Sequence, residues 1–295
     1  MTTARAEEFE IHRPRLFGIA YRMLGSAHEA EDAVQDTWLR FDGTDRAAVE
    51  RPAAWLATAV TRLCLNRLTS ARARRERYPG TWLPEPVVTA EGALGPQEAA
   101  ELRDGVSYAL LVLLERLTPT ERAVYVLREA FAYGHREISG VLGIGEANCR
   151  QLYRRAVARL AEGEARFEAA PRRQRELVES FVAAARDGDL TALERVLADD
   201  VTWWSDGGGR VSAALRPVVG RAKVVRFLLG TLRKGGDGLT YTITEVNGAA
   251  GLLVHAGDQP VGVLAFGCDG DAIARVRAVM NPDKLDFVRR QLARG

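Results

Sequence analysis

The sequence predicts a multidomain protein in which two all-helical units are followed by an α+β unit. Its 295 residues, 47% of them hydrophobic, exceed the usual size of a single domain and can bury more than one core. Apolar residues recur at helical spacing through most of the chain before Gly188, whereas short β-rich runs dominate after it. We therefore expect units at 1–80, 101–168 and 171–295, with a linker at 81–100.

Helical periodicity defines the first two units. From Phe9 to about Arg77, apolar residues recur three or four positions apart, with a break at 42–45 and a new helix near Pro52. Proline and glycine are then dense between residues 79 and 96, which is typical of a linker. Helical spacing resumes and runs to Phe167, and Thr118 is expected to cap a helix there.

The third unit is expected to combine short strands with helices. The strands are predicted at 201–204, 239–246, 250–255, 261–268 and 272–279, and the helices at 174–186, 190–197, 223–232 and 283–292. Gly, Asp or Asn bounds each strand, which favours antiparallel pairing and an α+β domain.

Charge and cysteine content exclude several classes of protein. The formal net charge is only +2, so any signal for nucleic-acid binding must be local. Cys64, Cys149 and Cys268 lie far apart, which disfavours a disulfide framework or a metal site, and we expect neither metal nor cofactor. A signal segment and an apolar run of ~18 residues are both lacking, which predicts a cytoplasmic protein without membrane contact.

Two polar segments are candidates for DNA contact. Residues 62–77 contain six arginines and one glutamate, and this density suits phosphate contact unless the segment is a solvated helix end. Residues 135–160 predict two helices joined by a turn at Gly143, with Val157 among the inward side chains of the second helix. The outward Asn, Gln and Arg side chains can contact base edges, as in a helix-turn-helix, although a helical hairpin with a polar face remains the alternative.

The same segments resemble a known family. Residues 30–40 (AEDAVQDTWLR) resemble the sigma-factor segment that docks on the polymerase clamp helices, and 52–67 resemble the strand-opening, minus-ten-recognition helix. The second helical unit is similar to sigma region 4, which reads the minus-35 element. With only regions 2 and 4, the pattern is similar to the extracytoplasmic-function (group IV) sigma factors.

Three further motifs resemble the subgroup with a C-terminal, cone-shaped SnoaL-like extension. They are WLPEP at 82–86, DGGGR at 206–210 and NPDKL at 281–285. Arg210 stands where that subgroup has Lys, which keeps the charge but not a lysine-specific contact. The resemblance implies a non-enzymatic protein in which the extension replaces a separate anti-sigma protein.

The resemblance also implies partners and roles for named residues. The partners are core RNA polymerase, through its β′ clamp helices and β flap, and promoter DNA. Expected polymerase contacts are Asp32, Gln35, Asp36, Trp38 and Leu39, with core packing as the alternative for Trp38 and Leu39. Expected minus-ten contacts are Arg62, Asn66, Arg67, Arg72, Arg74 and Arg75, and expected minus-35 contacts are Asn148, Arg150, Gln151, Arg154 and Arg155. The regulatory interdomain set is Trp82, Leu83, Pro84, Glu85, Pro86, Asp206, Gly207, Gly208, Gly209, Arg210, Asn281, Pro282, Asp283, Lys284 and Leu285.

Three interpretations of the third unit stay open. It acts through protein contacts, or it senses a small-molecule ligand that shifts a closed-to-open equilibrium, or it is an enzyme resembling polyketide cyclases. For the enzyme, Asp206, His255, Trp203 and Trp204 are the available candidates.

Overall fold

The chain forms two compact units in the computed structural model. The structure describes residues 2–75, 77–90, 93, 106–161, 170–235 and 238–293. The first unit consists of residues 1–76, 95–106 and 110–165, and the second of residues 77–94, 107–109 and 166–295. Each unit has its own core and is described by itself.

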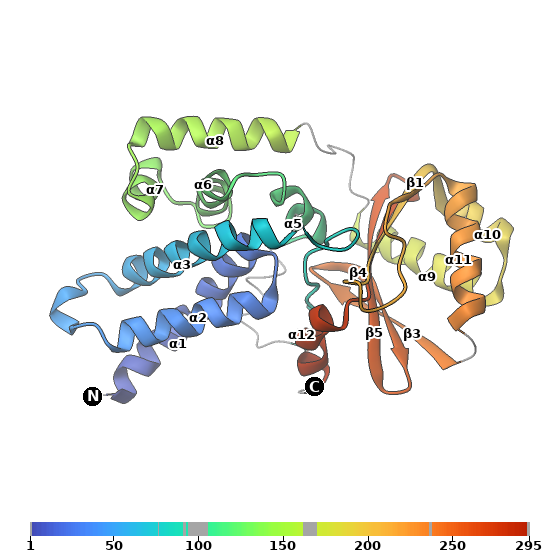
Figure 1. Cartoon of the computed structure of the whole chain (residues 1–295), viewed down its shortest axis with the longest axis horizontal. Helices are drawn as coiled ribbons and strands as arrows, with labels where there is room; N and C mark the ends of the chain where they lie inside the picture. The colour runs from blue at the N-terminus through green and yellow to red at the C-terminus, as the bar shows by residue number, and fades with distance from the viewer. Residues whose placement is uncertain are drawn as a thin grey trace. The chain divides into compact units, whose positions relative to one another are not determined.

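The first unit begins with a three-helix bundle, drawn in blue to cyan in Figure 1. Its helices are α1 (Thr2–Leu24), α2 (Ala27–Asp42) and α3 (Pro52–Arg75), with a 3₁₀ turn at Arg46–Ala48. Ser26 caps α2 by accepting a hydrogen bond from the Glu29 N–H, and α2 ends before Gly43. The buried residues Tyr21, Phe41 and Leu56 come from the three helices in turn, so one shared core holds the bundle together.

Four shorter helices follow, and apart from Tyr108 and Ala109 they belong to the first unit. They are α5 (Tyr108–Leu114), α6 (Pro119–Glu129), α7 (His135–Leu142) and α8 (Glu146–Ala161). Thr118 and Glu121 form a reciprocal capping box at the start of α6. Gly143 ends α7 with φ of 68°, a left-handed conformation that glycine adopts without strain, and this sets the turn into α8. The predicted helix-turn-helix is present.

The second unit is built on one six-stranded sheet. The strands are β1 (Leu197–Asp206), β2 (Val218–Val219), β3 (Leu239–Val246), β4 (Ala249–Ala256), β5 (Gln259–Asp269) and β6 (Ala272–Val279), in the order β2-β1-β6-β5-β4-β3. β1 pairs parallel with β6, whereas the other neighbours are antiparallel. The expectation of antiparallel pairing is therefore wrong at this one pair. Four strands lie between β1 and β6 along the chain, so the two are not hairpin partners and the path of the intervening chain sets their relative direction.

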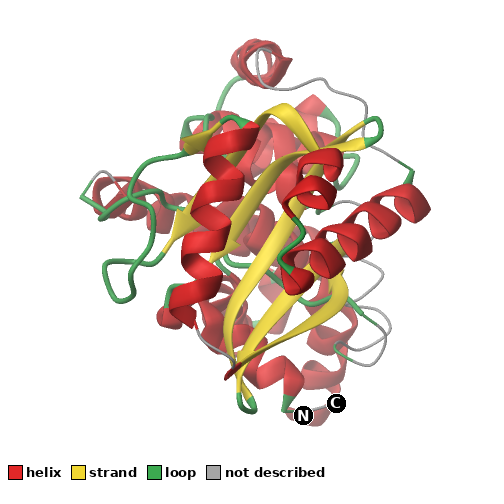
Figure 2. Cartoon of the chain, turned by 90° about the vertical axis from the view of Figure 1, so that its right-hand side faces the viewer, coloured by secondary structure: helices red, strands yellow, loops and turns green. Residues whose placement is uncertain are grey.

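Helices cover both faces of this sheet. On one face lie α9 (Pro171–Asp187), α10 (Leu190–Val196) and α11 (Arg221–Gly235), as Figure 2 shows for helices crossing the yellow strands. Their apolar side chains share a core with Trp203, Phe266 and Val276 of the sheet. Alternation along β1 sends Trp204 and Asp206 to the opposite face, where α12 (Pro282–Leu292) packs against β5. The predicted fold class, two all-helical parts followed by an α+β domain, is confirmed.

Candidate promoter-binding and regulatory sites

A cavity of about 470 Å³ lies in the three-helix bundle, beside the loop between α2 and α3. Arg40, Arg51 and Arg62 line it together with Trp55, while Glu50 is the acidic lining residue. An aromatic ring among cationic side chains suits a stacked base and its phosphates. Of these residues, sequence reasoning named only Arg62 as a minus-ten contact, although Trp55 lies in the segment 52–67 that resembles the strand-opening helix. An arginine directly before the helix-starting Pro52, with a tryptophan one turn later, was the available signal.

The expected polymerase contacts lie on α2 and divide into two kinds. Leu39 is 61% exposed, which leaves it available to a partner. Trp38 instead packs its ring 5.1 Å from that of Phe9, so it also helps to hold α1 against α2. Gln35 is exposed, and Asp36 is half-buried.

One of the expected minus-ten arginines, Arg67, binds other parts of the bundle. Arg67 donates to the carboxylate of Asp36 at 2.6 Å and to the Glu29 carbonyl oxygen at 3.1 Å, and it also lies 3.8 Å from Asp32. Residues expected to bind DNA and polymerase are therefore paired with each other. Asn66 is exposed on the same helix. The side chains of Arg72 and Arg74 lie outside those that the structure describes.

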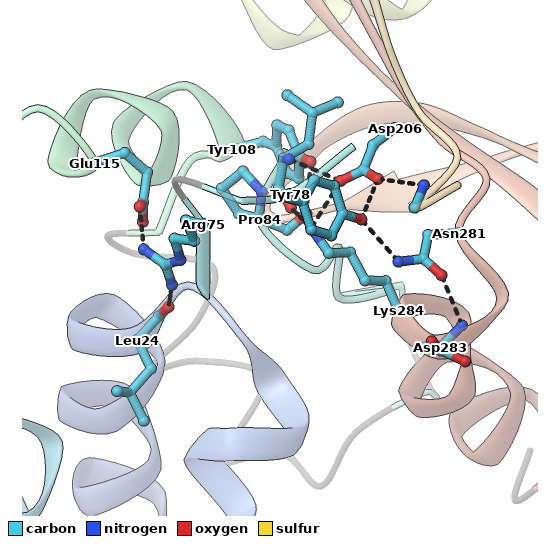
Figure 3. A network of polar contacts seen from close by, with 12 residues as sticks. Leu24, Arg75, Tyr78, Pro84, Tyr108, Glu115, Asp206, Asn281, Asp283 and Lys284 are labelled. Carbon is cyan, nitrogen blue, oxygen red and sulfur yellow. Dashed lines mark hydrogen bonds and ion pairs between the residues drawn. The ribbon is translucent and has the colours of Figure 1, made fainter. Parts of the chain in front are cut away.

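A buried ionic network joins the bundle to the four shorter helices. Arg75 pairs with Glu115 and donates to the Leu24 carbonyl oxygen at 2.5 Å (Figure 3). Glu115 also receives a hydrogen bond from Arg122 at 2.5 Å, and Arg122 donates to the Arg22 carbonyl oxygen at 2.8 Å. Burial lowers the pKa of Arg75, and the nearby Glu115 carboxylate opposes that shift. Sequence reasoning missed Glu115 and Arg122, because no local pattern reveals that they share a network.

Arg62 makes a second link between the two helical parts. Its Nε donates to the Val141 carbonyl oxygen of α7 at 3.0 Å. Arg62 and Arg75, both expected to bind the minus-ten strand, are thus engaged with the region 4 helices in this structure.

Helix α8 presents the expected minus-35 residues to solvent. Exposed side chains on it are Asn148, Arg150, Gln151, Arg154 and Arg155. Arg150 pairs with Glu146 one turn earlier, and Arg155 lies 3.7 Å from the buried Glu121 of the α6 cap. Val157, expected to point inward, is 41% exposed, and that expectation is wrong because Cys149, Leu152 and Ala156 form the inner stripe instead.

In the second unit, a buried ion pair holds the linker. Lys284 of α12 lies 2.7 Å from Asp206 at the end of β1, and both side chains are almost completely buried. Asp206 accepts the Leu83 N–H at 2.8 Å, and Lys284 donates to the Leu83 carbonyl oxygen. The Lys284 ammonium also lies 4.0 Å from the ring centroid of Trp82. The ion pair therefore binds both backbone polar groups of one linker residue, and we call Asp206, Lys284 and Leu83 the latch.

Tyr78 and Asn281 extend this latch (Figure 3). The Tyr78 hydroxyl donates to Asp206 at 2.5 Å and accepts from the Asn281 amide at 2.8 Å. Burial first, and the hydrogen bond to Asp206 second, raise the pKa of Tyr78. Asn281 also caps α12, accepting from the Asp283 N–H at 3.1 Å. The motifs at 82–86, 206–210 and 281–285 thus meet at one point.

Gly208 shows why the 206–210 motif is rich in glycine. Its φ is +60°, and a Cβ there would lie 2.3 Å from the Asn281 amide nitrogen. A side chain would therefore be strained and would displace the Asn281 amide from Tyr78. Arg210 makes only an exposed pair with Asp283 at 3.4 Å, which contributes little to stability.

The rest of the linker binds along the sheet and α12. Residues 83–89 are all buried. Val87 exchanges hydrogen bonds with Asn247, at 3.1 Å to its side chain and 2.9 Å from its backbone N–H. Val88 pairs in both directions with the side-chain amide of Gln291, and Thr89 donates to the Glu245 carbonyl oxygen. This segment therefore belongs to the C-terminal domain as a structural element.

The acid–base pair required by the enzyme interpretation does not form. Asp206 lies on β1 and His255 on β4, and two strands separate them, which is about 14 Å in the hydrogen-bonding direction. The Asp206 carboxylate is also fully bound by the latch. Trp203 lies in the helix-covered core, where its ring contacts that of Phe227.

Among the described residues, no helix is both long and apolar enough to cross a membrane.

Known proteins share both parts of this architecture. The model for Sigma-70 region 2 matches residues 9–74, and that for Sigma-70 region 4 matches residues 107–160. The ECF RNA polymerase sigma factor SigJ of Mycobacterium tuberculosis is 42% identical over 247 residues, covering 83% of this chain and 79% of SigJ. The probable ECF sigma factor SigI of the same organism is 30% identical over 96% of both chains. The crystal structure of M. tuberculosis SigJ matches with a TM-score of 0.77 and 35% identity, over 96% of this chain and 98% of that chain. The chain therefore belongs to the extracytoplasmic-function RNA polymerase sigma factors, which bind core polymerase and promoter DNA through regions 2 and 4, and it carries an additional α+β C-terminal domain.

Proposed function

We propose that this sigma factor is regulated in cis, because its C-terminal domain binds the linker between regions 2 and 4. The observation that carries the proposal is the latch, in which Asp206 and Lys284 bind the N–H and the carbonyl of Leu83. A fused domain needs little intrinsic affinity for this purpose, since the tether keeps its effective concentration high. A separate anti-sigma protein is then not required.

Within the first unit, the cavity at Arg51 and Trp55 supports a role in holding an unstacked base of the minus-ten strand. The cationic side chains around it would neutralise flanking phosphates, and Asn66 would offer a donor and an acceptor to a base edge. In region 4, Gln151 and Arg154 are exposed on α8 and have the chemistry for base and phosphate contact respectively. Leu39 and Gln35 would meet the clamp helices of the polymerase β′ subunit, and region 4 would meet the β flap.

Run-off transcription with core polymerase tests the regulatory role in the full-length chain. Asp206→Asn and Lys284→Met each remove one charge of the latch, and we expect both to raise transcription while binding to core polymerase is unchanged. Asp271→Asn is the matched control, because Asp271 makes an exposed ion pair with Arg173 in the same domain, away from the linker. Transcription equal to wild type in both latch variants would refute regulation through the linker.

The sensor interpretation is tested by adding small molecules to the same run-off transcription assay, where a ligand that the domain senses should change the amount of transcript. The helix-covered face of the sheet is packed by Phe181, Phe266 and Trp203, which favours a domain that acts through protein contacts.

A further inference from the structure

The linker can span the distance between the two promoter elements only if most of its length is free. Helix α3 ends at Arg75 and α5 begins at Tyr108, so residues 76–107 connect regions 2 and 4. At about 3.3 Å per residue, such a segment reaches about 105 Å when extended. Elements centred at minus 35 and minus ten lie about 25 base pairs apart, which is about 85 Å of B-DNA at about 3.4 Å per base pair.

The first unit cannot span that distance as folded. A compact body of roughly 150 residues has a radius of gyration of about 15 Å, hence a diameter of about 40 Å. Regions 2 and 4 are also joined within it by the bonds from Arg62 to Val141 and from Arg122 to Arg22. Occupying both promoter elements therefore requires the two regions to separate and the linker to extend.

Tyr108, at the C-terminal end of the linker, is hydrogen-bonded to Pro84 in the N-terminal part of the linker. Its side chain is buried, and its hydroxyl donates to the Pro84 carbonyl oxygen at 2.7 Å (Figure 3). Pro84 directly follows Leu83, which the latch holds, and Tyr78 is bound to Asp206 just before it. Tyr108 itself belongs to the same compact unit as the linker and the C-terminal domain. The chain between residues 84 and 108 is thus excluded from the path between the two regions.

We propose that the hydrogen bond from Tyr108 to Pro84 is a clasp that shortens the usable linker, so that regions 2 and 4 cannot occupy both promoter elements until it opens. With the clasp closed, Arg75 and Tyr108 are separated by at most about 40 Å of extended chain and side chain. If the clasp alone opens, the 19 residue steps from Thr89 to Tyr108 again add to the distance that the linker can span. They contribute about 60 Å of extended chain, even while the latch stays closed. This proposal rests on the proposed regulation through the linker. In it, the hydroxyl group of Tyr108 controls the length of linker that is available between regions 2 and 4.

Tyr108→Phe in the full-length chain tests this assignment. It removes only the hydroxyl, and loss of one such hydrogen bond should shift the equilibrium toward separated regions by about 2- to 10-fold. We expect run-off transcription with core polymerase to rise by a similar factor. Tyr241→Phe is the matched control, because Tyr241 lies on β3 in the same unit, away from Pro84.

The separation itself can be measured by energy transfer between dyes on Glu7→Cys in α1 and Ala158→Cys in α8, both at exposed positions. The native Cys64, Cys149 and Cys268 are buried, so labelling is directed to the introduced thiols. Lower transfer in Tyr108→Phe than in the control supports the clasp. Unchanged transfer and unchanged transcription overturn it.

A pair of insertions tests the same idea without touching Tyr108. Twenty glycine and serine residues placed after Arg77, before the first linker residue that binds Asp206, lengthen the path that the clasp leaves free, and should raise transcription. The same insertion after residue 95 lies in the excluded part and should leave transcription unchanged. Equal effects of the two insertions contradict the proposal. Lys284→Met separates it from the general regulatory role: if that variant raises transcription but Tyr108→Phe does not, only the clasp is wrong, and if neither does, both proposals fail.

Discussion

Lys284→Met removes the cationic half of the buried pair that holds the linker. The Asp206 carboxylate, with its side chain fully buried, would lose its ionic partner. Breaking a buried pair by removing one member typically costs about 3–5 kcal/mol. The hydrogen bonds that Asp206 keeps from Tyr78 and Leu83 place this variant at the lower end of that range.

Urea unfolding of the full-length chain measures this cost. With a slope of about 2–3 kcal/mol per M, we expect the transition of the C-terminal unit to move down by about 1–2 M. Tryptophan fluorescence reports it, because Trp82 lies against the Lys284 ammonium. Arg210→Met is the control, since its partner Asp283 is exposed and a surface pair contributes about 0–1 kcal/mol. A loss below about 1 kcal/mol in Lys284→Met would refute the claim that the latch is a buried, mutually dependent pair.

Three more predictions follow from the same contacts. Because folding raises the pKa of Tyr78, this residue contributes fully to stability below its unfolded pKa of about 10, and the contribution is lost as the pH rises from there toward the folded value. Above pH 10 the unfolding midpoint of wild type should therefore fall more steeply with pH than that of Tyr78→Phe. Parallel pH dependences of the two midpoints would contradict this. Glu115→Gln leaves Arg75 and Arg122 without their shared carboxylate, so it should destabilise the first unit by about 3 kcal/mol or more. Thermal unfolding measures this loss, and a melting temperature equal to that of wild type would contradict the prediction. Arg154→Ala should reduce the slope of log K against log salt for a minus-35 duplex by about 0.9, as expected for one lost phosphate contact, and an unchanged slope would remove Arg154 from the interface.

Local patterns along the chain were enough to predict most elements. The strands at Leu239–Val246 and Ala272–Val279 were predicted at their observed bounds, because each is a β-rich run beside turn-forming residues such as Gly238, Asn247 and Asp271. Gly143 indicated the turn of the helix-turn-helix, because glycine adopts the left-handed backbone conformation of that turn without strain. The parallel pairing of β1 with β6 was missed, because strand direction depends on the path of the whole chain.

The two sigma regions, the α+β C-terminal domain and the three motifs could be predicted from the amino-acid sequence, because each is encoded within a few tens of residues by periodicity, capping and turn chemistry. The contacts that those motifs make are visible in the folded structure alone. Asp206 and Lys284 are 78 residues apart and Tyr108 lies 24 residues from Pro84, and no local pattern specifies such partners. The folded structure also determines that Arg62 and Arg75 bind region 4 in this state, because an arginine suited to a phosphate is equally suited to a carboxylate or a carbonyl, and folding selects which one it meets.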